Sequence, residues 1–271
     1  MYLFRRYRLI LALTLVFSFG CSFASAADSP VIDRIAKAGV LKVGMSGNQA
    51  PMNAKNRSGQ MIGLEVSLAN MLTAMMDVKL EIVNKPFPEL LPALKAGEVD
   101  MVMSGLTITL QRSADILFVG PYMLSGKSIL TKSKILANSD DAGDVNKPNL
   151  TITALENSNS QAYVEKHIPE AKLVLSKDYD SAVQMVLNDK ADALVADMPV
   201  CLLSIMRYPE QDLVTLREPF TIEPLGMAIQ SNDPQFLNLL ENYLRTLEGM
   251  GVMDQLRKRW LEDSSWIASL P

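Results

Sequence analysis

The stretch VKLEIVNKPFPELLPALKAGEVDMVM at residues 78–103 decides the fold class. Apolar residues predict a strand over 78–84 and a short helix over 87–96 that ends before Gly97. Residues 100–103 then form a short apolar strand. A strand, a helix and a second strand in this order are typical of a parallel sheet with a crossover helix.

The residues before this stretch continue the same alternation. A short helix is predicted over 32–37, a strand over 40–45 and an amphipathic helix over 63–76. Residues 47–60 are rich in Gly, Asn, Ser and Pro, so a loop is expected there. The first part of the chain is therefore an α/β unit.

A second alternating series follows the polar, turn-rich residues 138–148. Two successive series imply two α/β lobes. The final residues are predicted to be helical, with a break at residues 248–251. The predicted elements are an extended segment over 127–131, strands over 150–154, 171–175 and 193–196, and helices over 160–166, 180–188, 234–248 and 252–261.

Composition excludes several classes of protein. The 271 residues are 48% hydrophobic and 21% charged, which is a globular balance. A net charge of −4 gives a nucleic-acid partner no electrostatic support. Two cysteines, Cys21 and Cys201, and one histidine, His167, argue against a disulfide-dense scaffold, a cysteine zinc site and the common metal clusters. No metal and no cofactor are expected.

Residues 1–26 have the pattern of a secretory signal. Arginines at positions 5, 6 and 8 precede the apolar run at 9–19, and small residues follow at 24–27. We expect cleavage after Ala26 and export to the periplasm. Cys21 follows Gly20, so lipid attachment at Cys21 stays open as the alternative to a cleaved, unanchored leader.

Short motifs follow one another in a fixed order along residues 30–262. They are GVLKVG at 39–44, GLEV at 63–66, LPAL at 91–94, GEVD at 97–100, GLTITLQR at 105–112, GPY at 120–122, DKADA at 189–193 and VAD at 195–197. As an ordered set they resemble the periplasmic solute-binding proteins of polar amino-acid ABC importers.

This resemblance implies a two-lobed α/β fold, the type II periplasmic-binding-protein fold, with a ligand cleft between the lobes. Lobe one would comprise residues 28–125 plus 227–271, and lobe two residues 126–226. The implied function is transport without catalysis: the protein would bind an amino acid, or a similar small amino-carboxylate, and pass it to an ABC permease in the inner membrane. A monomer is expected.

The resemblance also implies the residues that hold the ligand. Arg112 would bind the carboxylate with its planar fork of donors, with help from Thr107 and the backbone at Gly105. Asp197 would bind the ammonium, although an Asp before Met198-Pro199 could instead cap a helix. In lobe two, the turn with Ser158 and Asn159 would offer free N–H groups at a helix start.

Three further positions match the family's pocket and bear on the ligand. Phe87 would line the pocket or belong to the core. Ser46 stands where the family often has an acid for a basic side chain, and Gln49 where it often has an aromatic residue. These departures favour a neutral polar amino acid.

Two other functions stay open on the same fold. A dehydratase that resembles cyclohexadienyl dehydratases would need a positioned acid, and Glu156 is the candidate. A sensory module would report its ligand through a separate membrane partner. Fold alone does not decide among the three.

Overall fold

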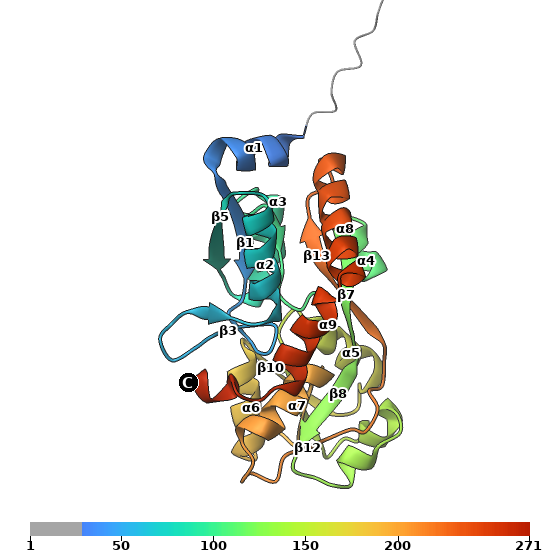
Figure 1. Cartoon of the computed structure of the whole chain (residues 1–271). Coiled ribbons are helices and arrows are strands. Elements are labelled where there is room, and N and C mark those ends of the chain that lie inside the picture. Colours follow the sequence, from blue (N-terminus) through green and yellow to red (C-terminus); the bar gives the residue numbers. More distant parts are fainter. Residues whose placement is uncertain (1–28) are drawn as a thin grey trace, which may run out of the picture.

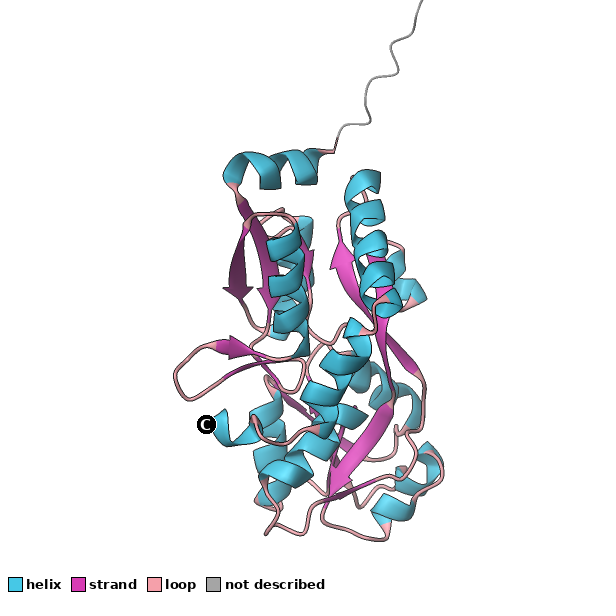
Figure 2. Ribbon diagram, viewed as in Figure 1, coloured by secondary structure: helices cyan, strands magenta, loops and turns pink. Residues whose placement is uncertain are grey.

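The computed structural model describes residues 29–271, which form two lobes, each built on a five-stranded sheet (Figures 1 and 2). The predicted signal at residues 1–26, with Cys21, lies outside the described residues. Within the described part of the chain, no helix is both long and apolar enough to cross a membrane.

The sheet of lobe one is mixed rather than wholly parallel, so the prediction of a parallel sheet was only partly right. Its first three strands are parallel, and β13 alone runs in the opposite direction, antiparallel to β6 on one side and to β7 on the other. The reason is that one strand arrives from lobe two, about 100 residues later in the chain. In sheet order the strands are β5 (Lys79–Asn84), β1 (Val40–Met45), β6 (Met101–Val102), β13 (Glu223–Ile229) and β7 (Leu117–Ser125).

Helices α2 and α8 of lobe one bury apolar side chains against this sheet. Leu68 of α2 and Leu240 of α8 are fully buried in the same core as Leu41 and Val43 of β1. Tyr243 also donates a hydrogen bond to the carbonyl of Leu68 at 2.7 Å. The helices are α1 (Pro30–Ala38), α2 (Leu64–Met75), α3 (Phe87–Lys95), α4 (Leu110–Ser113), α8 (Pro234–Gly249) and α9 (Val252–Arg257), continued by the π-helical turn Lys258–Glu262.

The prediction of a loop over residues 47–60 was wrong in part. Two very short strands lie there, β2 (Asn48–Gln49) and β3 (Asn53–Lys55), and they form a small antiparallel sheet with β4 (Met61–Ile62) just after it. Its polar sequence gives no strand signal, since two or three residues are too few for a periodic pattern. Gly63 lies between β4 and the following helix and has φ +135°. An added Cβ there would lie 2.1 Å from the carbonyl oxygen of Met52, so this position needs a glycine.

The sheet of lobe two is also mixed. Strands β10, β9 and β11 are parallel, and β8 runs antiparallel to β11 and β12. In sheet order the strands are β10 (Lys172–Ser176), β9 (Thr151–Leu155), β11 (Ala193–Asp197), β8 (Lys127–Thr131) and β12 (Val214–Thr215). The helices are α5 (Asn159–His167), α6 (Tyr179–Leu187) and α7 (Met198–Arg207), with 3-10 turns at Leu136–Asn138, Ala142–Val145 and, in the tail, Ile267–Ser269.

Two chain segments cross between the lobes and pack against each other. The backbone N–H of Lys127 donates to Thr221 Oγ1 at 3.0 Å, and Phe220 N–H donates to the Lys127 carbonyl at 2.7 Å. Gly126 permits this approach, because a Cβ there would lie 2.1 Å from the Thr221 carbonyl oxygen. The predicted lobe boundaries stay a prediction. The one between residues 226 and 227 falls inside β13, which begins at Glu223.

An apolar cluster joins the two lobes. Phe87 and Leu90 of α3 and Leu106 share this cluster with Tyr179 and Ala182 of α6. All five side chains are buried. The lobes therefore touch through side chains that have the character of a core.

The C-terminal tail forms a second connection between the lobes. Leu270 is buried against Leu203 of α7. On the side of lobe one, Arg57 Nε donates to the Leu270 carbonyl at 2.9 Å; on the side of lobe two, an Arg207 nitrogen donates to the Pro271 carbonyl at 2.7 Å. The tail lies beside α6 and the β3 hairpin (Figure 1).

Asp233 joins the beginnings of two helices. Its buried carboxylate accepts from Phe236 N–H of α8, and from Ser29 Oγ and Val31 N–H of α1, each at 2.8 Å. Burial by itself raises the pKa of Asp233, but these hydrogen bonds outweigh it, and the pKa lies below the ordinary 3.8.

Replacing Asp233 by Ala should therefore destabilise the protein by about 1–3 kcal/mol at pH 7, measured by urea unfolding. The wild-type advantage should be complete above about pH 4 and disappear as the pH falls through the lowered pKa. Asp141→Ala is the matched control, since exposed Asp141 accepts from Gly143 N–H at the start of a surface 3-10 turn. Equal losses in the two variants would contradict this assignment.

Candidate functional site

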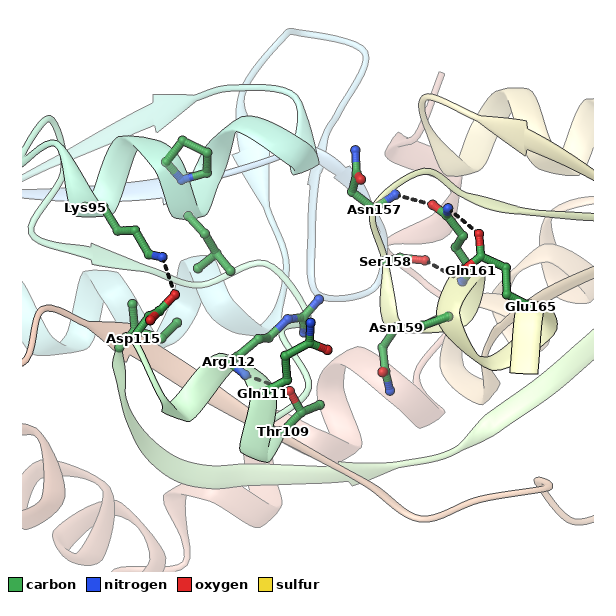
Figure 3. A pocket seen from close by; sticks show the side chains of 14 residues that line it. Lys95, Thr109, Gln111, Arg112, Asp115, Asn157, Ser158, Asn159, Gln161 and Glu165 are labelled. Carbon is green, nitrogen blue, oxygen red and sulfur yellow. Dashed lines mark hydrogen bonds and ion pairs between the residues drawn. The ribbon is translucent and has the colours of Figure 1, made fainter. Parts of the chain in front are cut away.

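A cavity of about 410 Å³ opens between the lobes. Lobe one supplies residues of α3 and α4, and lobe two supplies the turn before α5 and its first residues. Figure 3 shows Arg112 on one side of the gap and Asn157, Ser158 and Asn159 on the other.

Arg112 is held by the local fold of α4. Thr109 precedes this helix, and its Oγ1 accepts from the Arg112 N–H at 3.2 Å. The guanidinium donates to the Thr107 carbonyl at 3.0 Å, the one hydrogen bond that it makes within residues 29–271. Burial lowers the pKa of Arg112, and the charges of Asp197 and Glu223 oppose that shift. Arginine nevertheless stays a cation, with donors left for a carboxylate.

The beginning of α5 faces Arg112 across the cavity. Ser158 is the helix cap: its Oγ accepts from Gln161 N–H at 3.1 Å and donates to the Leu155 carbonyl at 2.6 Å. The backbone N–H groups of Asn159 and Ser160 have no hydrogen-bond partner in the described part of the chain. Free N–H groups at a helix start suit an anion.

Asp197 belongs to a buried cluster of charges. Its Oδ1 lies 2.7 Å from Lys127 Nζ, and the same ammonium lies 4.0 Å from Glu223 Oε2. The Lys127 side chain is 1% exposed. Asp197 precedes α7, but its side chain makes no capping hydrogen bond. The alternative that the Asp197 side chain caps this helix is therefore wrong.

Sequence reasoning missed Lys127 and Glu223. Lys127 is paired with Asp197 by the antiparallel register of β8 and β11, which are 70 positions apart in sequence. Glu223 accepts from Asn159 Nδ2 at 2.7 Å and from Thr221 Oγ1 at 2.9 Å. The one signal in the sequence was a charged residue at the first position of each of two apolar strands, Lys127 in β8 and Glu223 in β13.

Gly105 lies against Gln49. Its φ is +56°, and an added Cβ would lie 2.0 Å from Gln49 Nε2, so this close approach needs a glycine. Gln49 is buried, and its Oε1 lacks a hydrogen-bond partner among the described residues. Thr107 is buried and forms a bridge to Leu225 of β13.

A buried polar network holds the backbone of Gly105 through its N–H group. The fully buried Glu65 accepts from Gly105 N–H at 2.8 Å, from Asn53 Nδ2 at 2.6 Å and from the Tyr122 hydroxyl. Burial raises the pKa of Glu65, and these hydrogen bonds oppose that shift. Sequence reasoning missed Glu65, because an acid in an amphipathic helix is usually a solvent-exposed residue.

Ser46 is attached to the same network. Its Oγ donates to Asn53 Oδ1 at 3.2 Å and accepts from Ser104 Oγ at 2.9 Å. Ser46 also borders a second opening between the lobes, together with Glu156 of lobe two.

The nine predicted site residues are therefore not all in one place. Arg112, Ser158 and Asn159 line the cavity, and Asp197 belongs to the charge cluster that Asn159 reaches through Glu223. Gly105, Thr107, Gln49 and Ser46 form a buried region of lobe one beside it. Phe87 lies in the apolar cluster that joins the lobes and does not line the cavity.

Solved structures place this architecture among two-lobed periplasmic amino-acid-binding proteins. The ancestral amino acid-binding protein AncCDT-1, described as a precursor of cyclohexadienyl dehydratase, superposes with a TM-score of 0.78 at 33% identity, covering 86% of this chain and all of that one. A putative ABC-transporter binding component from Wolinella succinogenes, complexed with lysine, has a TM-score of 0.81 at 33% identity, covering 85% and 99%.

The chain belongs to the bacterial extracellular solute-binding proteins, family 3, whose model matches residues 41–263. It is 25% identical over 236 residues to the cyclohexadienyl dehydratase of Pseudomonas aeruginosa, covering 87% of this chain and 88% of that protein. It is also 25% identical over 258 residues to the ABC transporter arginine-binding protein 1 of Escherichia coli K12, covering 93% and 98%.

Replacing Glu65 by Gln should destabilise the protein by about 1–3 kcal/mol, because the amide group would turn an N–H toward donors that now face oxygen. Urea unfolding of wild type and variant measures the difference. Glu81→Gln on the exposed side of β5 is the control and should stay within about 0.5 kcal/mol of wild type. A Glu65 variant as stable as this control would mean that the network contributes nothing.

Proposed function

We propose that the protein is an extracytoplasmic binding protein that delivers an amino acid, or a similar small amino-carboxylate, to an ABC importer. The observation that carries this proposal is the convergence of Arg112 from lobe one with the first turn of α5 and the Asp197 cluster from lobe two. The relatives named for amino-acid binding support it. The export signal expected at residues 1–26 agrees with a periplasmic location.

The mechanism would be hinge closure. The ligand carboxylate first meets Arg112, and lobe two then adds the N–H groups at the start of α5 and the carboxylates near Lys127. The permease would recognise the closed form, so the ligand must bind that form more tightly than the open one. The lobes would rotate about the two crossing segments, which pack closely at Gly126 and Thr221.

The test is a thermal-shift screen of the purified protein against the twenty amino acids. A ligand that binds only the folded protein raises the melting temperature. Arg112→Ala should weaken binding of the hit by about 100-fold or more, because two charge-assisted hydrogen bonds are lost. Arg217→Ala, at an exposed arginine outside the cavity, is the control and should bind as wild type does.

A screen without any hit would overturn the proposal and favour a second function. The similarity to a cyclohexadienyl dehydratase over 87% of the chain is the specific observation behind it. Glu156, half-buried at the second opening between the lobes, would be the acid. Incubation with prephenate decides: turnover by wild type that Glu156→Gln abolishes would establish the enzyme.

A further inference from the structure

We infer that Lys127 determines the net charge that the cleft accepts in its ligand. The cleft therefore selects amino acids with uncharged side chains over arginine and lysine. This inference rests on the proposed function and names the ligand class for the same site. It is carried by four charged side chains at the cleft. Arg112 lines the cavity, and the buried cluster of Lys127, Asp197 and Glu223 reaches it through Asn159, which donates a hydrogen bond to Glu223.

The position of Lys127 is fixed. Its ammonium lies 2.7 Å from Asp197 and 4.0 Å from Glu223, and the three side chains are 1%, 7% and 10% exposed. Its backbone is part of β8, directly opposite Asp197 in β11. Charges this deeply buried are poorly screened by solvent, so an unbalanced charge among them is costly.

Counting charges gives the ligand class. Lys127 neutralises one of the two carboxylates, which leaves the Lys127–Asp197–Glu223 cluster with one net negative charge. Arg112 balances that charge, and both carboxylates act on Arg112. A ligand carboxylate engages Arg112, and the ligand ammonium then balances the cluster. A zwitterion with an uncharged side chain satisfies every charge, whereas a further cation or anion stays unpaired.

The other buried acids among the described residues already have partners. Glu65 is the acceptor for three donors, Asp100 binds Arg34 and the Lys42 N–H, and Asp233 holds the beginnings of α1 and α8. The acids at the second opening, Glu89, Glu156 and Asp178, are exposed or half-buried and share that opening with Lys85 and Lys177. Solvent screens them.

The test changes the charge count in both directions. Each variant is screened for thermal shift with all twenty amino acids, and the readout is the charge class of the strongest ligand. Lys127→Met should move the preference from uncharged to basic side chains, and Glu223→Gln toward acidic ones, each by roughly tenfold or more in relative affinity. The double variant restores a balanced count and should prefer uncharged side chains again.

Lys132→Met is the matched control, because Lys132 directly follows the last residue of β8 and pairs with Asp189 away from the cleft. It should keep the wild-type preference. If Lys127→Met does not melt cooperatively, Glu223→Gln and the double variant carry the comparison. A wild type that prefers arginine or lysine, or a preference unmoved by Glu223→Gln, overturns this inference but leaves amino-acid binding intact; no binding at all overturns the proposed function itself.

Discussion

The ion pair between Lys127 and Asp197 is the interaction on which the geometry of the molecule depends. Lys127 begins β8 just after the first crossing between the lobes, and Glu223 begins β13 at the second. Both crossings therefore meet at one buried ammonium. A buried pair of this kind costs desolvation and adds little net stability, but removing one partner would leave a charge stranded in the interior. The two crossings and the cleft therefore depend on the same buried ammonium, which must keep its carboxylate partners.

The two lobes contribute different things to the cleft. Lobe one offers a side chain, the guanidinium of Arg112, whose position follows from the short helix α4 and the Thr107 carbonyl. Lobe two offers backbone N–H groups at the start of α5, whose position follows from the Ser158 cap, and beside them the buried charges of the Lys127 cluster. Neither set can surround a small ligand alone, and this is why a cleft between lobes suits capture of a free solute.

The parts of the fold that the sequence predicted are those with local causes. The strand over 127–131 and the helices near 63–76 and 234–248 follow from the spacing of apolar residues, and the structure confirms them within one residue at each end. The antiparallel pairing of β7 with β13 was missed, because its partners are about 100 residues apart and no short-range pattern encodes them.

The same limit applies to the site. Arg112, Ser158 and Asn159 could be proposed because a motif marks each stretch. Lys127 and Glu223 could not, because their importance arises from what lies opposite them in space. Glu65 was missed for a different reason: helical periodicity gave it no role, although three donors converge on its carboxylate.

The C-terminal tail has a consequence for the strength of binding as distinct from its selectivity. Because Leu270 and Pro271 contact Arg57 on one lobe and Arg207 on the other, any rotation of the lobes must strain or release those contacts. The free energy of those contacts is part of the equilibrium between lobe arrangements. The measured dissociation constant is inversely proportional to the fraction of molecules in the arrangement that binds ligand. Changes in the last few residues can therefore adjust affinity for every ligand alike, without altering a single atom of the cleft.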